Sequence, residues 1–347
     1  MSALTTLLGI KHPIIQAPMA GVQTSALAIA VSAAGGLGSL PCAMLSHDAL
    51  RAELTTLKSS GCGAYNVNFF CHTPPTPDAA KEQRWRETLA PYYAEFEIDP
   101  TKAVPEQARA PFSAELAELL SEFAPPVVSF HFGLPSPDLL ARVRSWGAKI
   151  IGCATTLDEA RWLEAHGADA IIAQGVEAGG HRGMFLTDDL TTQISTSMLV
   201  TQIVAALRVP VIAAGGIADA TDVQAMLAVG AAGVQIGTAY LLCDEATTKQ
   251  VHRHALQSTD AQYTALTTVF SGRPARGIVN RLMRELGPIS ALTPAFPLAS
   301  AAVAPLRAAA EQRGSGDFSP MWAGQNTSGC KAIPAAELTR QLASVDV

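Results

Sequence analysis

The sequence predicts one α/β domain of the TIM (β/α)8 barrel class, because eight short apolar runs alternate with helical segments along the chain. The runs are apolar throughout rather than alternating, which is typical of parallel strands buried on both faces. An open doubly wound sheet is the alternative, but the regular spacing of the later units and the lack of an early G-x-G-x-x-G favour the barrel. The eight predicted strands are Pro13–Met19, Gly36–Leu40, Ala64–Phe70, Val127–Phe132, Lys149–Ala154, Ala170–Gln174, Val209–Ala214 and Gly233–Thr238.

The helical segments between these runs carry start and stop signals. Pro137–Trp146 begins with proline and is followed by Gly147, which is the usual order at the two ends of a helix. The other clear segments are also followed by a glycine, and they are Thr24–Ala34, Leu157–His166 and Asp219–Val229.

Two stretches interrupt this rhythm, and a tail follows it. Thr73–Pro111, rich in proline and charge, predicts an insertion after strand three that serves as a lid or a dimer contact. Gly175–Leu190 predicts a long loop after strand six. We therefore expect a barrel over residues 1–260, with the insertion at about 73–111, and a C-terminal segment over 261–347 that packs on the barrel and closes its site.

Composition excludes several classes of function. The net charge of -6, without a cluster of lysine and arginine, argues against nucleic acid or an anionic membrane as partner. The six cysteines form no C-x-x-C pair and most stand in apolar runs, so they predict buried thiols in a reducing compartment. No stretch approaches the length of a membrane span, and a cytoplasmic location is the expectation.

Glycines follow the last two predicted strands, where TIM barrels commonly bind phosphate. Strand seven ends before Gly215 and Gly216, and strand eight ends in Gln235, Gly237 and Thr238. Adjacent glycines let backbone N–H groups approach an anion closely. A tight turn alone would explain either glycine, but both loops together favour a phosphate site.

Polar residues at other strand ends suggest a site at the barrel mouth. His131, between two aromatic residues at the end of strand four, is a candidate general base, although a core histidine is equally compatible with its position. Gln174 could present its amide to a heterocycle, and Gly179 would let the next loop lie flat against a planar ring. Asn68 is expected to face the mouth.

Two further groups of side chains are candidates for binding. His252 and His254 lack other ligands at suitable spacing, so no metal site is expected. Arg273 and Arg276 in SGRPARG fit an anion clamp or a partner contact, and a solvated loop fits them at least as well.

Seven motifs in barrel order resemble the nitronate monooxygenase family, formerly called 2-nitropropane dioxygenase: APMAG, NVNFF, SFHFGLP, AQGVEAGGHRG, PVIAAGGIAD, GVQIGTAYL and MWAGQNTSG. The resemblance runs from about Ile10 into the tail. The GGHRG and GGI loops are shared with flavin-dependent enoyl-[acyl carrier protein] reductases and NADH:quinone reductases. SFHFGLP is the discriminating motif, and it points to the class I monooxygenases.

This resemblance implies FMN as cofactor and His131 as the catalytic residue. It implies oxidative denitrification of an alkyl nitronate by O2 to a carbonyl compound and nitrite, with propionate 3-nitronate as the suggested substrate. The cofactor-binding residues that it implies are Met19, Asn68, Gln174, Gly179, Gly216, Gln235, Gly237, Thr238 and, closing over the flavin, Gln325, with His181 as a further substrate or flavin contact.

The resemblance leaves a second activity open. An NAD(P)H-dependent flavin reductase acting on quinones or enoyl thioesters would share these loops, but no sequence feature marks a nicotinamide site. A barrel that carries FMN without turnover would not require His131, and a sugar-phosphate aldolase would want a lysine or carboxylate at the strand ends. A homodimer is compatible with the sequence.

Overall fold

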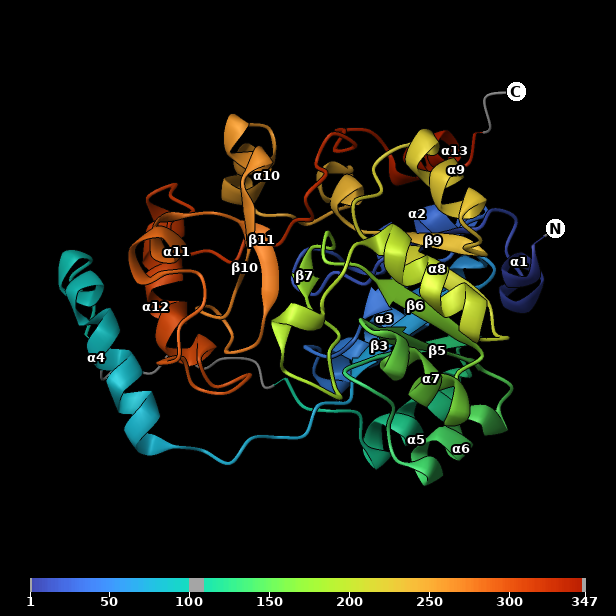
Figure 1. The fold of residues 1–347 in the computed structure, drawn as a ribbon, viewed down its shortest axis with the longest axis horizontal. Helices are drawn as coiled ribbons and strands as arrows, with labels where there is room; N and C mark the ends of the chain where they lie inside the picture. The colour runs from blue at the N-terminus through green and yellow to red at the C-terminus, as the bar shows by residue number, and fades with distance from the viewer. Residues whose placement is uncertain (1, 100–108, 345–347) are drawn as a thin grey trace.

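The computed structural model describes residues 2–99 and 109–344 and contains an eight-stranded parallel barrel (Figure 1). The strand order is β1-β9-β8-β6-β5-β4-β3-β2, and a parallel bridge between Ile15 and Leu37 joins the two outer strands. The TIM-barrel prediction is therefore confirmed. The strands are β1 Ile14–Gln16, β2 Gly38–Pro41, β3 Tyr65–Phe70, β4 Val127–His131, β5 Lys149–Ala154, β6 Ala170–Gln174, β8 Val211–Ala214 and β9 Gly233–Ile236.

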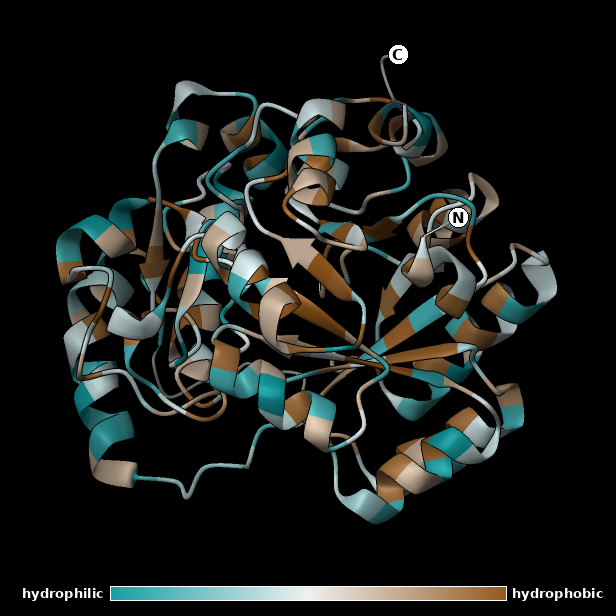
Figure 2. Cartoon of the chain, turned by 45° about the vertical axis from the view of Figure 1, so that its right-hand side comes forward, coloured by the Kyte–Doolittle hydropathy of each residue, from teal (hydrophilic) through white to brown (hydrophobic). Residues whose placement is uncertain are grey.

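The barrel strands are apolar on both faces because each face packs against a different layer. On β6, Ile172 belongs to the cluster inside the barrel, whereas its neighbour Ile171 belongs to the layer beneath the surrounding helices. Leu4 and Leu8 of α1, Ala3–Leu8, join the inner cluster and cover its lower end. Figure 2 shows the apolar strands at the centre of the molecule, with helices of mixed polarity around them.

Seven helices follow barrel strands and cover the outer layer. The four segments predicted as helices are confirmed as α2, α6, α7 and α9, each within one or two residues of the predicted ends. The seven are α2 Ser25–Ala33, α3 His47–Ser60, α5 Ala114–Phe123, α6 Pro137–Ser145, α7 Leu157–Ala165, α8 Thr196–Ala206 and α9 Ala220–Ala228, and α13 Ala335–Leu342 packs against α2 and α9.

The insertion after β3 packs on the C-terminal segment and forms a second apolar core beside the barrel. Its helix α4, Ala79–Glu95, lies along α12, Ser300–Gln312 (Figure 1). Trp85 is fully buried and its indole N–H donates to the Ala299 carbonyl at 3.2 Å. Leu89, Tyr92 and Tyr93 of α4 also belong to this core, and its other buried members, including Phe318, come from the C-terminal segment. The described part of the insertion is thus anchored within the chain, while residues 100–108 of it lie outside the described residues.

The C-terminal segment also pairs directly with the loop after β6. Within that loop a short strand, β7 Gly180–His181, adds to β11 Ala275–Ile278, which pairs in turn with β10 Thr264–Thr267. The remaining described elements of the chain are the helices α10 Gln250–Leu256 and α11 Arg281–Leu286 and the short turns η1 Leu190–Thr192, η2 Thr238–Leu242 and η3 Thr259–Gln262.

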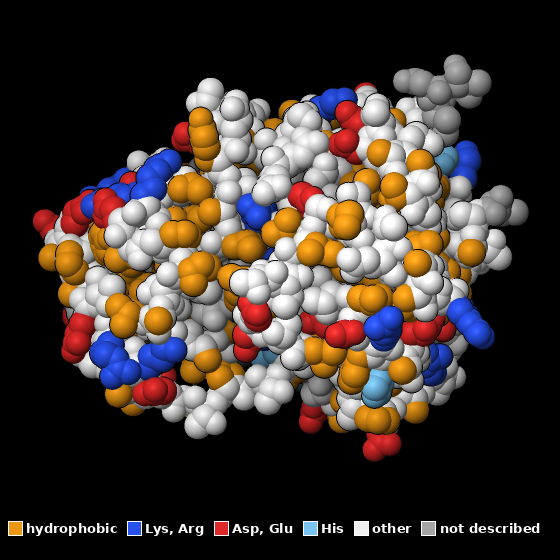
Figure 3. Space-filling model, viewed as in Figure 1, with side chains coloured by type: hydrophobic (Ala, Val, Ile, Leu, Met, Phe, Trp, Pro, Cys, Tyr) orange, Lys and Arg blue, Asp and Glu red, His pale blue; other side chains and the backbone are white. Residues whose placement is uncertain are grey.

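The surface carries mixed charge. On the face shown in Figure 3, basic and acidic side chains lie beside each other rather than gathering into a patch of one sign. Among the described helices, none is both long and apolar enough to cross a lipid bilayer.

Candidate active site

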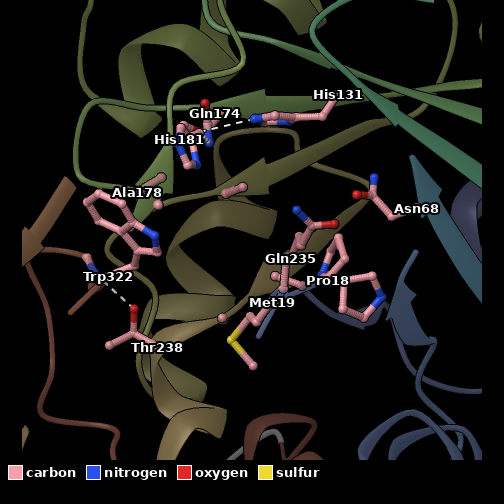
Figure 4. Close-up of a pocket in the computed structure, with 18 of the residues that line it drawn as sticks. Pro18, Met19, Asn68, His131, Gln174, Ala178, His181, Gln235, Thr238 and Trp322 are labelled. Carbon is pink, nitrogen blue, oxygen red and sulfur yellow. Dashed lines mark hydrogen bonds between the residues drawn. The ribbon is translucent and has the colours of Figure 1, made fainter. Parts of the chain in front are cut away.

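A cavity opens at the carboxyl ends of the barrel strands, where the C-terminal segment covers it (Figure 4). Its wall includes residues that follow six of the strands, together with Trp322 and Asn326 from the C-terminal segment. The structure brings together ten of the residues predicted for the site: Met19, Asn68, His131, Gln174, Gly179, His181, Gly216, Gln235, Gly237 and Thr238.

Gln325 is the predicted site residue that does not line the cavity. Its side chain is exposed, and its backbone N–H donates to the Glu177 carbonyl at 2.9 Å. Its neighbours Gly324 and Asn326 line the cavity instead. The motif therefore reaches the site, but through the residues on either side of the glutamine.

His131, at the end of β4, presents a neutral imidazole to the cavity. Burial lowers the pKa of His131 to about 4, and the positive charges of Arg273 and Arg182 act in the same direction, while a hydrogen bond to the backbone of His181 opposes them. Its Nε2 lies 3.1 Å from the His181 carbonyl oxygen. Because a carbonyl only accepts, we assign the proton to Nε2, which leaves Nδ1 with a free lone pair.

The same carbonyl also anchors Gln174, at the end of β6. The Gln174 side chain donates to the His181 carbonyl at 3.0 Å and accepts from the Gly183 N–H at 2.8 Å. The His181 ring is held from the other side, with Nε2 2.9 Å from the Ser271 hydroxyl. Gln174 thus fixes the shape of the loop that carries His181, in addition to lining the cavity.

Arg182 holds this loop from below. Its guanidinium, fully buried, donates to the carbonyls of Gln174 and Gly175 at 2.6 Å each and to the side chain of Gln193. Burial lowers the pKa of Arg182 to about 10, so it remains charged at neutral pH. The AQGVEAGGHRG motif contains this arginine, but the sequence assigned it no role, because its role depends on carbonyls that the fold brings to it.

Arg273 and Arg276 clamp the loop from the C-terminal segment, so the interpretation of SGRPARG as a solvated loop was wrong. Arg276 is 5% exposed and donates to the Val176 carbonyl at 2.8 Å. Arg273 donates to the Met184 carbonyl and stacks over the Phe132 ring, with 4.2 Å from its guanidinium carbon to the ring centre. Both guanidinium groups therefore bind backbone carbonyls within the protein.

At the end of the cavity opposite His131, the loops after β6 and β8 and the C-terminal segment approach one another closely through their backbones. Gly215 and Gly216 have φ of 127° and 74°, a region that favours glycine. A Cβ on Gly179 would lie 2.5 Å from the Gly324 nitrogen, so only glycine allows the C-terminal segment to approach the loop after β6. Gly324 in turn donates its N–H to the Thr238 hydroxyl at 2.9 Å.

Asn326 joins these backbones to the loop after β8, and sequence reasoning missed it. Its amide donates to the Gly216 carbonyl at 3.1 Å and to the Asp222 carboxylate at 3.2 Å. Asn326 directly follows the predicted Gln325, so the MWAGQNTSG motif contained the signal by which it could have been predicted as a site residue.

Asn68 and Met19 form the floor of the cavity beside Gln235 (Figure 4). The Asn68 amide donates to the Ser129 hydroxyl at 2.9 Å, which fixes its orientation. The Met19 backbone N–H donates to Gln23 at 2.8 Å. Within the described residues, no group of three or more His, Cys, Asp or Glu could hold a metal ion.

Comparison with known proteins agrees with this geometry. The model of the nitronate monooxygenase family matches residues 1–344. The chain is 43% identical over 341 residues to the nitronate monooxygenase of Pseudomonas aeruginosa, covering 97% of each chain, and 42% identical to that of Paraburkholderia phytofirmans, covering 98% of this chain and 93% of the other.

Solved structures give the same result. A nitroalkane oxidase from Streptomyces ansochromogenes superimposes with a TM-score of 0.88 at 39% identity, covering 99% of this chain and 97% of the other. FabK from Thermotoga maritima is more distant, with a TM-score of 0.70 at 26% identity, covering 99% and 94%. The chain therefore belongs to the nitronate monooxygenase family, and it is an oxidoreductase that oxidises nitronates.

Proposed function

We propose that this protein uses FMN and O2 to convert alkyl nitronates into carbonyl compounds and nitrite. The observation that carries the proposal is the neutral His131 imidazole, which faces the same cavity as the glycine-rich loops after β8 and β9. A phosphorylated redox cofactor requires an anion-binding site, and a neutral nitro compound requires a base. This cavity offers both.

The residues at the cavity fit FMN. Among the described residues, the backbone N–H groups of Gly216 and Thr238 have no hydrogen-bond acceptor, and both residues line the cavity. Backbone N–H groups of this kind bind phosphate. Gly216, Gly237 and Thr238 would hold the phosphate, Gln235 and Asn326 would lie beside it, and Met19, Asn68, Gln174 and Gly179 would lie against the ring.

The charge of the cavity suits an anionic substrate. Within the described part of the chain, its wall contains no aspartate or glutamate, and the arginine Arg307 on the wall is ion-paired with Glu311 at 2.9 Å. A nitronate is an anion, so it would be repelled by a carboxylate, and none lines this cavity. This lining contrasts with the net charge of -6 of the whole protein.

The protein's own part in the reaction is to position the substrate and to move one proton. FMN, when bound, would supply the electron acceptor and the route of electrons to O2. With a neutral nitroalkane, Nδ1 of His131 would take the proton from the carbon next to the nitro group, leaving the nitronate. The His181 carbonyl would keep the imidazole oriented, and the aromatic side chains Phe70 and Trp322 in the cavity lining would exclude water.

The NAD(P)H-dependent reductase is the weaker candidate. The relatives named nitronate monooxygenase are 42–43% identical, against 26% for the FabK structure. A propionate 3-nitronate substrate, a homodimer and a cytoplasmic location stay predictions.

An anaerobic reduction experiment distinguishes the two activities. The purified protein is expected to show the visible absorption of bound flavin, and an alkyl nitronate without added NADH should bleach it. Admission of air should then restore the absorption and release nitrite. If NADH bleaches the flavin and nitronate does not, the reductase is correct and the proposed activity is wrong.

A further inference from the structure

We propose that Arg273 is a positioning residue for His131, which holds the strained turn that carries the base and disfavours protonation of its imidazole. The inference rests on the proposed function, because it takes His131 as the base for neutral nitroalkanes. Arg273 does not line the cavity, so it would act through its neighbours and not by touching the substrate.

The geometry joins Arg273 to His131 through one aromatic ring. The guanidinium carbon of Arg273 lies 4.2 Å from the centre of the Phe132 ring, and the centres of the Phe132 and His131 rings are 4.5 Å apart. The guanidinium is therefore within about 9 Å of the imidazole. Its hydrogen bond to the Met184 carbonyl fixes it in this place.

The backbone between the two side chains is strained. Phe132 has a φ of 69°, which is unusual for a bulky residue, and Gly133 follows with 93°. Such a conformation persists only where the surroundings enforce it. Phe132 packs against Phe70 and Phe296, with ring centres 5.1 and 5.5 Å away. Arg273 covers the Phe132 ring itself, while Arg109 lies over the Phe296 ring, 5.8 Å from its centre. Removing Arg273 would free the turn that aims His131.

Arg273 also places a lasting positive charge near the base. None of the ion pairs among the described residues includes Arg273, and its Nε is buried without a hydrogen-bond partner. Its charge is balanced only at a distance, by Asp188 and Glu159. A fixed cation disfavours a second positive charge on His131, which adds to the larger effect of burial in keeping the pKa of His131 low.

The other groups around His131 do not replace Arg273. Arg182 acts in the same direction, but its effect on the pKa of His131 is smaller than that of Arg273. On β5, burial raises the pKa of the Cys153 thiol to about 12, so it is uncharged, and burial likewise raises the pKa of the Cys71 thiol after β3. The ring of His181 is neutral, because burial lowers its pKa well below the ordinary value.

Four variants test the proposal with two measurements. Arg273→Gln removes the charge but keeps a donor, Arg273→Met removes both, and Arg273→Lys keeps the charge. Arg284→Met, at an exposed position on α11, is the control. The first measurement is kcat/KM for freshly dissolved, still neutral nitroethane as a function of pH. The second is an NMR titration of the His131 ring, assigned with His131→Asn, which needs no activity.

We expect the acid limb of kcat/KM and the NMR titration to move up together by about one pH unit in Arg273→Gln and Arg273→Met. Arg273→Lys should stay close to the wild type in both measurements, and Arg284→Met should be unchanged. If Arg273→Met does not fold, the comparison of Arg273→Gln with Arg273→Lys still tests the proposal.

Other outcomes overturn the proposal. A loss of rate that is equal at every pH, with an unmoved His131 titration, would reduce Arg273 to a scaffold residue. A wild-type protein that does not oxidise nitroethane or nitronate would instead refute the proposed function, and the NMR titration would still test Arg273 separately.

Discussion

The sharpest test of the site is His131→Asn, because it separates proton removal from all later steps. Asparagine can still donate to the His181 carbonyl, which His131 Nε2 contacts at 3.1 Å, but it cannot take up a proton. The pKa of His131 is about 4, so at pH 7 only about one imidazole in a thousand is protonated, and nearly all of the protein has His131 able to accept a proton. A positioned general base contributes roughly a hundredfold to ten-thousandfold.

We therefore expect kcat/KM for neutral nitroethane to fall by roughly 10² to 10⁴, a rise of about 3 to 5 kcal/mol in the barrier. With nitronate prepared beforehand in base, the proton has already left, and the loss should stay below about tenfold. The assay is oxygen uptake with each form of the substrate, combined with the flavin absorbance per protein.

His254→Asn is the matched control, because His254 is exposed on α10 and does not line the cavity. An equal loss for neutral nitroethane and for nitronate would show that His131 binds or shapes the site and is not the base. Unchanged rates with the neutral substrate would refute the assignment entirely.

Three further predictions concern the cofactor site, acid stability and the insertion. Gly216→Glu should purify without flavin, because a side chain at a φ of 74° is strained and a carboxylate beside Glu177 would repel phosphate; wild-type flavin content in the absorption spectrum would contradict this. The free energy of unfolding should decrease as the pH falls from about 6.5 to about 4. In this range the histidines of the unfolded chain become protonated, whereas the buried histidines of the folded protein stay neutral. His252, 6% exposed and with a pKa lowered to about 4 mainly by burial, should account for up to about 3 kcal/mol of this, and urea titrations of the wild type and His252→Gln at several pH values measure it. Trp85→Ala should destabilise the α4–α12 core by about 3 to 5 kcal/mol, seen as earlier proteolysis of α4, whereas Thr88→Ala on its exposed face should not.

The sequence alone determined the barrel, because the signals for it are local. The predicted strands Lys149–Ala154 and Ala170–Gln174 coincide with β5 and β6. A run of apolar residues must be buried on both faces wherever it lies, and a glycine after a helix ends that helix in any fold. For the same reason the cavity could be located at the strand ends, and ten of the predicted residues line it.

The chemistry of those residues was decided by tertiary structure. The position of His131 was set by the carbonyl of His181, fifty positions away, and by a cavity that no local pattern describes, and both support the proposal that it is a base. The ends of the first two strands also shifted, since β1 stops at Gln16 and β2 continues to Pro41. Strand ends follow the hydrogen bonds of neighbouring strands, which are not local.

The arginines show this division most clearly. SGRPARG was as compatible with a solvated loop as with a binding site, yet Arg273 and Arg276 are held by the Met184 and Val176 carbonyls, about ninety and one hundred positions earlier. Sequence specifies which residues are able to donate hydrogen bonds or carry charge. Only the folded chain decides which acceptors they reach and how far water is excluded, and both affect the ionisation of His131.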